Sequence, residues 1–455
     1  MHAALNYQQL LRAELAQRQE SGYDVAAIEA RISADGGIAA LAQDRARSLL
    51  TELESTTARP GWTFFEPESL AEIISEADWP APDHAAPGAD YEAKAARAWN
   101  GRIAGNMLGK PVESLGEWSP PVLRSFLESQ DAWPLTDYFP AVADTGEDFP
   151  EYVPCWTETT RGRISGSARD DDLDYTILNL HILRTVGPDF STADVAAAWL
   201  TLLPFLQTFT AERVAIRNLV AGVDPEDAAN VRNPYREYIG AAIRADVFGY
   251  VSPGDAAGAA ELAYRDAVLS HRANGVYGEM WCAALVASAF TANGIREAFD
   301  RSLTVVPHRS RLHAALSSVR EWRDRGLSWE EARARIDSEL GFYGSVHTVV
   351  NAAVLAAGLL WADGDFDRSI ALTVLGGLDT DSNGATAGSV AGLLAPSIDE
   401  RWTAPLEDTV RSAVFGYDGI SISSLVAHTV EVATALREKS VSAVAAEAYT
   451  PRDIW

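Results

Sequence analysis

Apolar residues recur at intervals of three and four along most of the chain, the spacing at which side chains share one face of an α-helix. Near the N-terminus, residues 7–18, 24–32 and 39–53 show this pattern, with good helix formers between the apolar positions. Residues 255–269 and 345–360 are rich in alanine and predict buried, closely packed helices. Alternating β-branched runs are almost absent. The pattern therefore predicts an all-α protein with a compact multi-helix fold.

The helical pattern is interrupted at residues 79–90, WPAPDHAAPGAD. This segment holds three prolines and a glycine, which disfavour regular helix and are typical of a linker. From Tyr91 the helical pattern resumes. We therefore divide the chain into an N-terminal helical extension with its linker, residues 1–90, and a main domain, residues 91–455.

A second interruption covers residues 119–163, which are rich in proline, tryptophan, tyrosine and aspartate. The composition predicts one long irregular segment. Such a segment within a compact domain is usually a lid or binding loop, and a plain surface loop is the alternative. Trp133 and Trp156, which lie here, are the tryptophans that we expect to offer stacking surfaces, whereas most others should be core residues.

Charge and composition exclude several classes of function. The chain has 37 basic and 64 acidic residues, a net charge of −27, which disfavours contact with nucleic acid or anionic lipid. The first thirty residues show no secretory signal, and no apolar run reaches the roughly 18 residues that span a bilayer. Cys155 and Cys282 are too few for a disulfide framework or a thiolate zinc site. We expect a cytoplasmic protein with no nucleic-acid or membrane partner; the oligomeric state stays open.

Four aspartates precede an apolar run in the segment SARDDDLDYTILNLHIL: Asp170, Asp171, Asp172 and Asp174. One or two carboxylates at a helix start are explained by capping and by the helix dipole. Four adjacent negative charges are not, because they repel one another unless a cation neutralises them. The cluster predicts a cation site.

A second acidic cluster lies in the segment GGLDTDSNGATAG, where Asp379, Asp381 and Ser382 follow two glycines. Oxygen ligands of this kind suit Mg²⁺, Mn²⁺ or Ca²⁺ rather than zinc. An EF-hand is excluded, because its twelfth position is Val390 instead of a bidentate glutamate. A polar turn before a small-residue helix is the alternative to a metal site.

Motifs of several other enzyme classes are incomplete in this sequence or absent from it. The segment GNMLGKPVES, residues 105–114, resembles a phosphate loop, but its spacing is wrong and Pro111 stands where serine or threonine should bind Mg²⁺. Dinucleotide-binding, serine-hydrolase and zinc-protease motifs are absent. His271 and His347 lie beside apolar segments, and from the residues alone a buried core histidine is the expected role of either.

In their order along the chain, four segments together resemble the ADP-ribosylglycohydrolase family, which includes dinitrogenase-reductase-activating glycohydrolase and protein-ADP-ribose hydrolases. The resemblance covers residues 91–396. The four segments are GRIAGNMLGKPVE at 101–113, DDDLDYTIL at 170–178, IGAAIRADVFGYVSPGD at 239–255 with LSH at 269–271, and LDTDSNGATAG at 378–388.

The resemblance implies an all-α catalytic domain that hydrolyses an ADP-ribosyl or related ribosyl N- or O-glycosidic bond through two Mg²⁺ or Mn²⁺ ions. It assigns each site residue a role. Glu113, Asp171 and Asp172 are catalytic; Asp170, Asp171, Asp172, Asp379, Asp381 and Ser382 hold the metal; Gly240, Arg244 and His271 contact the substrate.

The chain also departs from the family pattern. Asp170 and Leu173 stand in place of threonines, Asn106 lies near the usual aspartate, and Ile239 replaces the asparagine before Gly240. These changes predict a divergent member with a more acidic metal site and a different wall around the ligand. Two alternatives stay open: a metal-assisted phosphoester hydrolase, and a non-catalytic ligand-binding or scaffold relative.

Overall fold

The computed structural model describes residues 6–82, 88–113 and 116–448, with the backbone alone for 439–448. Within these ranges the protein is built almost wholly from helices, and the only strands are β1 (Thr409–Val410) and β2 (Ile420–Ser421). The two strands pair antiparallel, with Thr409 opposite Ser421. The predicted all-α fold is confirmed.

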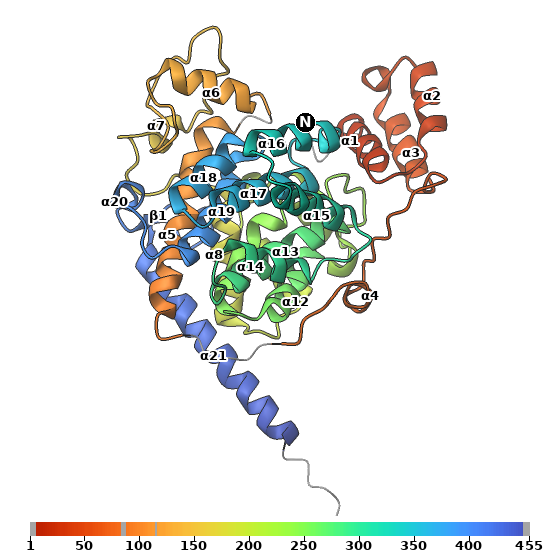
Figure 1. Ribbon diagram of the computed structural model, residues 1–455. Coiled ribbons are helices and arrows are strands. Elements are labelled where there is room, and N and C mark those ends of the chain that lie inside the picture. The colour runs from red at the N-terminus through yellow and green to blue at the C-terminus, as the bar shows by residue number, and fades with distance from the viewer. Residues whose placement is uncertain (1–5, 83–87, 114–115, 449–455) are drawn as a thin grey trace, which may run out of the picture.

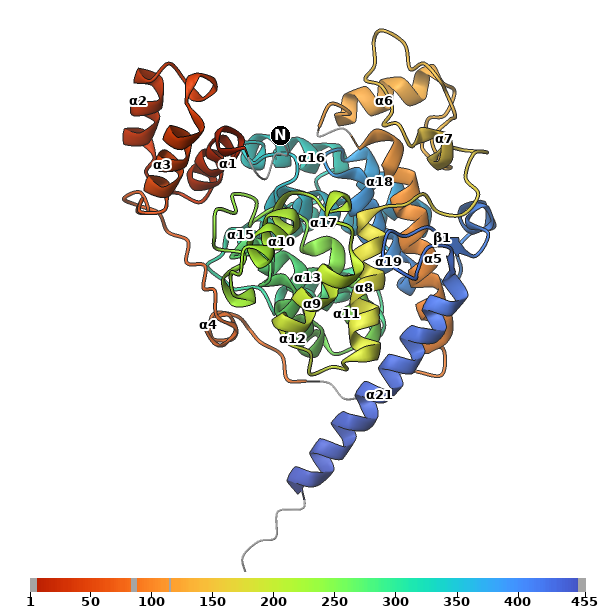
Figure 2. The same cartoon turned by 180° about the vertical axis from the view of Figure 1, so that it is seen from behind.

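The N-terminal helices form a small unit at one corner of the molecule (Figure 1). They are α1 (Tyr7–Glu20), α2 (Ala26–Ala34), the short 3-10 helix η2 (Ile38–Ala40) and α3 (Gln43–Leu53). Their buried residues make a core of their own, centred on leucines and isoleucines. From α3 the chain runs along the side of the main body through α4 (Leu70–Ser75) before it reaches α5 (Figure 2). In the predicted linker, residues 83–87 lie outside the described residues.

Buried polar contacts attach this unit to the main body. Gln17 of α1 and Ser21, the C-cap residue of α1, both donate hydrogen bonds to Glu237 Oε1, each of 2.8 Å. Arg311 binds Glu66 at 2.7 Å and also pairs with Glu237. Because Glu237 and Arg311 are buried, loss of either would leave the charge of the other without its partner in a low-dielectric interior. The extension is therefore an integral part of the folded protein.

The main body is a set of packed helices around four long buried ones: α5 (Tyr91–Gly109), α13 (Asn274–Ala289), α17 (Thr348–Ala362) and α19 (Thr380–Leu394). The apolar run around residues 349–362 is thus a core helix. The helices around them are α8 (Asp171–Thr185), α9 (Thr192–Leu202), η4 (Phe205–Gln207), α10 (Thr210–Val220), η5 (Pro225–Asp227), η6 (Ala242–Arg244), α11 (Asp246–Val251), α12 (Ala256–Ala267), α14 (Ile295–Leu303), α15 (Arg311–Asp324), α16 (Trp329–Leu340), α18 (Phe366–Leu375), α20 (Glu400–Thr403), η7 (Ala404–Leu406) and α21 (Ile422–Ala448).

Helices α5 and α19 pack backbone against backbone. A Cβ atom added at Gly105 would lie 1.9 Å from the Gly384 carbonyl oxygen, and one at Gly101 would lie 2.2 Å from the Gly388 carbonyl oxygen. Only glycine allows so close an approach. The contact brings the C-terminal end of α5 beside the N-terminal end of α19.

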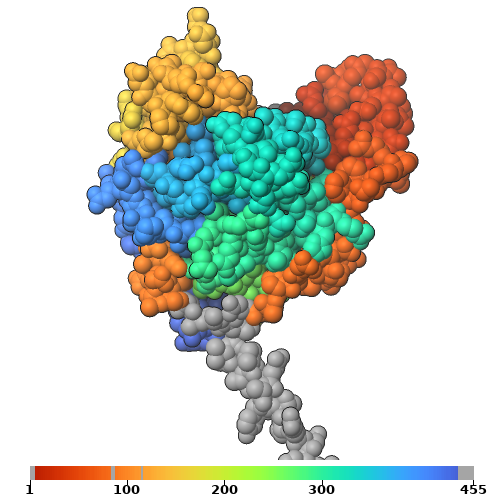
Figure 3. Space-filling model, viewed as in Figure 1, coloured from red at the N-terminus to blue at the C-terminus, as the bar shows by residue number. Residues whose placement is uncertain are grey.

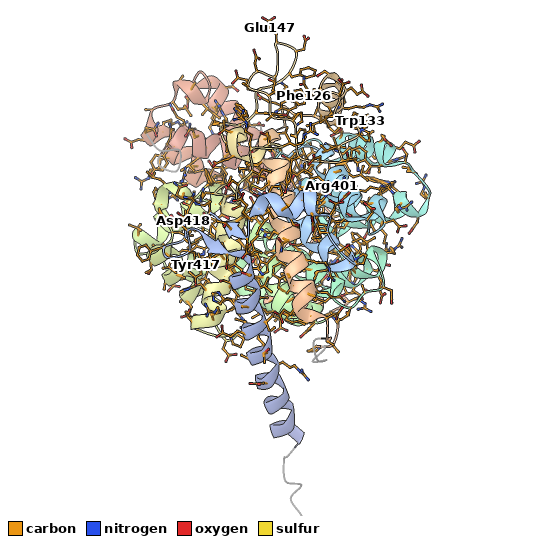
Figure 4. All side chains as sticks on the ribbon, turned by 90° about the vertical axis from the view of Figure 1, so that its left-hand side faces the viewer. Phe126, Trp133, Glu147, Arg401, Tyr417 and Asp418 are labelled. Carbon is orange, nitrogen blue, oxygen red and sulfur yellow. The ribbon has the colours of Figure 1, made fainter. Side chains whose placement is uncertain are left out.

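The predicted irregular segment at residues 119–163 is wrong in part, because it contains α6 (Pro120–Ser129) and the short α7 (Trp156–Thr159). Prolines 120 and 121 occupy the first helical positions, where their missing N–H groups cost nothing. We call residues 116–163 the α6–α7 lobe. Its aromatic residues pack on one another and are continuous with the main core: the ring centroid of Phe126 lies 5.1 Å from that of Trp118 and 5.5 Å from that of Tyr152. Figure 4 shows Phe126 inside this lobe and Glu147 at its tip.

The two tryptophans expected to stack on a ligand already have arginine partners. The Arg124 guanidinium lies 5.0 Å from the Trp133 ring centre, and that of Arg163 lies 5.7 Å from the Trp156 ring centre. Cation–π contacts of this kind occupy one face of each ring. The structure thus leaves their role in ligand binding as a prediction.

Two features shape the surface. The α1–α3 unit and the α6–α7 lobe stand at two corners with a depression between them (Figure 3). Helix α21 begins against α5, where Trp99 Nε1 donates to Thr429 Oγ1 at 3.0 Å, and then projects away from the body (Figures 1 and 2). Among the described residues, no helix has the length and apolar character that crossing a bilayer requires.

Candidate metal centre

Three chain segments converge at the end of α5. They are the 3-10 helix η3 (Lys110–Val112) with Glu113, the start of α8, and the start of α19. Thr380 Oγ1 donates to the Gly109 carbonyl at 2.8 Å and joins α19 to α5. The buried Arg102 donates to the Asp172 carbonyl at 2.8 Å and joins α5 to α8. These contacts hold the two aspartate clusters beside each other.

The first cluster caps helix α8. Asp170 is the N-cap residue, and its Oδ1 accepts a 3.0 Å hydrogen bond from the Asp172 amide. Asp174 is held by Arg169 at 2.8 Å and by the Ser412 hydroxyl at 2.7 Å. Asp174 therefore has a structural role, while Asp170 and Asp172 remain turned toward the other acidic residues.

The second cluster follows a tight turn into helix α19. Gly377 has φ 71° and Leu378 has φ 66°, so the chain enters the helix through two residues in the left-handed region. Asn351 Oδ1 accepts hydrogen bonds from the Asp379 amide at 3.2 Å and from Asn383 Nδ2 at 2.8 Å. The Ser382 hydroxyl donates to Asp379 Oδ1 at 2.8 Å. Asn351, which the sequence did not single out, and Ser382 thus fix the position of Asp379.

Two groups of three carboxylates meet here, and each has ligand atoms within 4.8 Å of one another. One group is Asp170, Asp172 and Asp381; the other is Glu113, Asp379 and Asp381. Asp381 is shared, so the groups adjoin. Asp171 belongs to neither group and is half-buried. The structure therefore joins five of the predicted carboxylates and leaves Asp171 outside both sets.

Three oxygens in the cluster lack a hydrogen-bond partner within the described part of the chain: Asp170 Oδ2, which forms an ion pair with Lys110, and Asp172 Oδ1 and Asp381 Oδ1. Asp172 is 3% exposed and Asp381 is 1% exposed. Buried carboxylate oxygens without partners are costly in a protein interior, and a bound cation relieves that cost. The donor set therefore fits a hard divalent ion.

The pKa shifts of the carboxyl groups in the cluster also favour a bound cation. Burial, and then the neighbouring carboxylates, raise the pKa of Asp172 and of Asp379 well above the ordinary value, and raise that of Glu113 as well. For Asp170 burial also raises the pKa and is the largest single effect, but the Lys110 charge and the hydrogen bonds with Lys110 and Asp172 together outweigh it and lower the pKa to about 2. Carboxyl groups that resist ionisation together are those that a metal ion would stabilise in the charged form.

Lys110 lies inside the cluster and was missed by the sequence interpretation. Its Nζ lies 2.7 Å from Glu113 Oε2 and 2.7 Å from Asp381 Oδ2, and it also contacts Asp170. Despite its burial, these carboxylates hold the Lys110 pKa well above the ordinary value. The signal in the sequence was its position three residues before Glu113; the contact with Asp381 could not be seen there.

The predicted substrate residues form a separate buried network. Arg244 is 0% exposed and pairs with Glu212 at 2.9 Å, with Asp266 at 2.5 Å and with Glu279 at 3.4 Å. His271 is also 0% exposed, and its Nδ1 lies 2.8 Å from Ser270 Oγ. Gly240 adjoins this network, since a Cβ there would lie 2.1 Å from Glu212 Oε1. The structure brings these three residues together, but in the interior rather than on an open surface.

A cavity of about 570 Å³ lies between the N-terminal extension and the main body. Trp62 and Phe64 line it from the extension side, and Trp322 and Tyr343 from the main body. None of its lining residues belongs to the acidic cluster. The cavity and the candidate metal centre are therefore distinct features.

Comparisons with known proteins give a match to one family model and to a solved structure. A solved structure described as an ADP-ribosylglycohydrolase-related protein complex is 17% identical, with a TM-score of 0.45; the match covers 76% of this chain and 99% of that one. No curated protein matches. The family model described as ADP-ribosylglycohydrolase matches residues 87–438, which include every residue of the acidic cluster. The chain belongs to the ADP-ribosylglycohydrolase family.

Proposed function

We propose that this protein hydrolyses an ADP-ribosyl or related ribosyl N- or O-glycosidic bond at the acidic cluster, with Mg²⁺ or Mn²⁺ as cofactor. Membership of the family supports a glycohydrolase function in general and the use of divalent metal. The observation that carries the proposal is the pair of three-carboxylate groups that share Asp381. A divalent ion bound there would supply Lewis-acid polarisation of substrate oxygens.

The chain's own residues fit glycoside chemistry. Cleavage at an anomeric carbon develops positive charge, which nearby carboxylates stabilise. Glu113 is the accessible member of the cluster, because its side chain is 34% exposed whereas that of Asp381 is 1% exposed. A base must reach the water that it deprotonates. Glu113 is therefore our candidate general base, and the buried aspartates are our candidates for cation and substrate binding.

Two expected roles need a different geometry from the one described. Asp171 lies outside both carboxylate groups, so we assign it to the rim of the site. Arg244 and His271 are buried in their own network, and they could contact substrate only after that region opens. We also propose that the substrate is a small molecule or an ADP-ribosylated molecule, and that the protein is cytoplasmic.

The test is an activity assay with matched variants. The protein, with Mg²⁺ or Mn²⁺, is incubated with ADP-ribosylated peptides, ADP-ribose derivatives and simple nucleosides, and the released ribosyl product is quantified. Loss of an outer-shell partner of a metal ligand typically costs about 10–100-fold in metal affinity or activity, so Asp381→Asn, which alters a direct ligand, should lower the rate about a hundredfold or more. The control, Asp363→Asn, makes the same change at an exposed left-handed position that asparagine tolerates.

The outcomes separate the alternatives. Glycosidic cleavage lost in Asp381→Asn and kept in Asp363→Asn supports the proposal. Release of inorganic phosphate from phosphoesters, without glycosidic cleavage, would support the phosphoester hydrolase instead. Absence of turnover on every substrate, together with tight binding of an ADP-ribose derivative, would support a non-catalytic relative.

A further inference from the structure

Lys110 places a permanent positive charge between the two carboxylate groups. Its ammonium contacts Asp170 of one group, Glu113 of the other, and the shared Asp381. An ammonium has three N–H donors, and three carboxylates surround this one. The lysine side chain is only 14% exposed. Lys110 is therefore a satisfied internal cation rather than a mobile surface lysine.

The backbone holds Lys110 in this place. Gly109, just before it, packs so closely on α19 that a Cβ would lie 2.1 Å from the Thr380 carbonyl oxygen. Pro111, just after it, restricts the backbone further. The Lys110 side chain therefore starts from a fixed point beside Asp381. Moving it out of the cluster would break three ion pairs at once.

The Lys110 ammonium binds carboxylate oxygens that two metal ions would need as ligands. Lys110 contacts Asp381 Oδ2, Asp170 Oδ2 and Glu113 Oε2, and Asp381 is the carboxylate common to both groups. Ions of a two-metal site lie roughly 3.5–4 Å apart and share ligands. An ammonium on the shared carboxylate would repel a second divalent ion at that range. The free oxygens left for a metal include Asp172 Oδ1 and Asp381 Oδ1.

We propose that Lys110 takes the place of one divalent ion, so that the cluster binds a single ion where the family resemblance implies two. This inference rests on the proposed function in one respect, namely that the cluster binds a divalent ion at all. Lys110 acts as a positioning residue that holds Glu113 and Asp381 together.

The experiment measures Mn²⁺ stoichiometry by calorimetry and Mn²⁺ coupling by electron paramagnetic resonance. The wild-type protein should bind one Mn²⁺ and give the six-line spectrum of an isolated ion. Lys110→Met, which keeps an unbranched side chain of nearly the same length and loses the charge, should bind two Mn²⁺ ions and show exchange coupling between them. Lys110→Arg should bind one. The control, Lys94→Met in helix α5, removes a lysine that donates a hydrogen bond to the Phe290 carbonyl, and it should behave as wild type.

Each result has a defined meaning. Two coupled ions in the wild type would overturn the inference and leave the proposed function standing. One ion in both the wild type and a folded Lys110→Met would also overturn it. No Mn²⁺ binding to wild type or variants would contradict the proposed metal-dependent function itself. Circular dichroism confirms folding, and Lys110→Arg provides the folded comparison if Lys110→Met proves unstable.

Discussion

Replacing Gly105 by alanine should force helices α5 and α19 apart. The added Cβ would lie 1.9 Å from the Gly384 carbonyl oxygen, whereas real Cβ contacts essentially never fall below 3.0 Å. The helices must therefore separate by about 1 Å or more, because the obstructing atom is main chain and no rotamer change can relieve it. A Cβ atom added at Gly384 would likewise lie too close, 2.4 Å from the Gly105 carbonyl oxygen.

The expected cost follows from two opposed effects. Overpacking in a well-packed core costs roughly 1–3 kcal/mol, and a backbone obstruction belongs at the upper end of that range. Alanine recovers about 1 kcal/mol through its higher helix propensity. We therefore expect Gly105→Ala to lower the free energy of unfolding by about 2 kcal/mol. It should also weaken Mn²⁺ binding, since Glu113 follows α5 and Asp381 lies in α19.

Urea unfolding, followed by circular dichroism, measures the first effect, and calorimetry measures the second. The control is Gly294→Ala at the start of α14, where an added Cβ meets nothing within 4 Å; its midpoint should stay at or slightly above that of the wild type. A Gly105→Ala protein with wild-type stability and wild-type Mn²⁺ affinity would show that the two helices do not pack as closely as described.

Three further predictions concern other parts of the molecule. Burial raises the pKa of Glu20 to about 7 from an ordinary 4.5, so the folded state holds more protons between these values and stability falls as pH rises through them. Glu20→Gln should remove that loss of stability, which is on the order of 1 kcal/mol after allowance for partial exposure. If the melting temperatures of the wild type and of Glu20→Gln change equally with pH from 4.5 to 7, the prediction is contradicted. Saturating Mn²⁺ at about 100 times its Kd should stabilise the wild type by about 2.7 kcal/mol and leave Asp379→Ala unchanged in thermal shift. Phe126→Ala should cost about 3 kcal/mol and expose the α6–α7 lobe to protease, whereas Phe415→Ala, at a residue 78% exposed, should do neither.

The sequence alone determined the helical character and the acidic chemistry of the protein. Helices α1, α2 and α3 follow from the three-and-four spacing, because burial of one helix face leaves a local pattern in the sequence, and α17 follows from its alanine-rich composition. The aspartates near α8 and α19 were identified for a similar reason: several like charges in a few residues are costly wherever they fold. The prediction of one irregular segment at 119–163 is wrong in part, because a proline-rich composition does not exclude a helix that begins with prolines, as α6 does at Pro120 and Pro121.

Only the tertiary structure decided which charged groups meet. Lys110 and Asp381 are separated by 271 residues in the chain, and their contact depends on the glycine packing of α5 against α19. Asp171 and Asp172 are adjacent in sequence, yet Asp172 joins a carboxylate group and Asp171 does not, since neighbouring residues of a helix point in different directions. Arg244 likewise finds its partners only in the fold. Local pattern sets the elements and the types of side chain, while long-range packing sets the distances on which charge pairing depends.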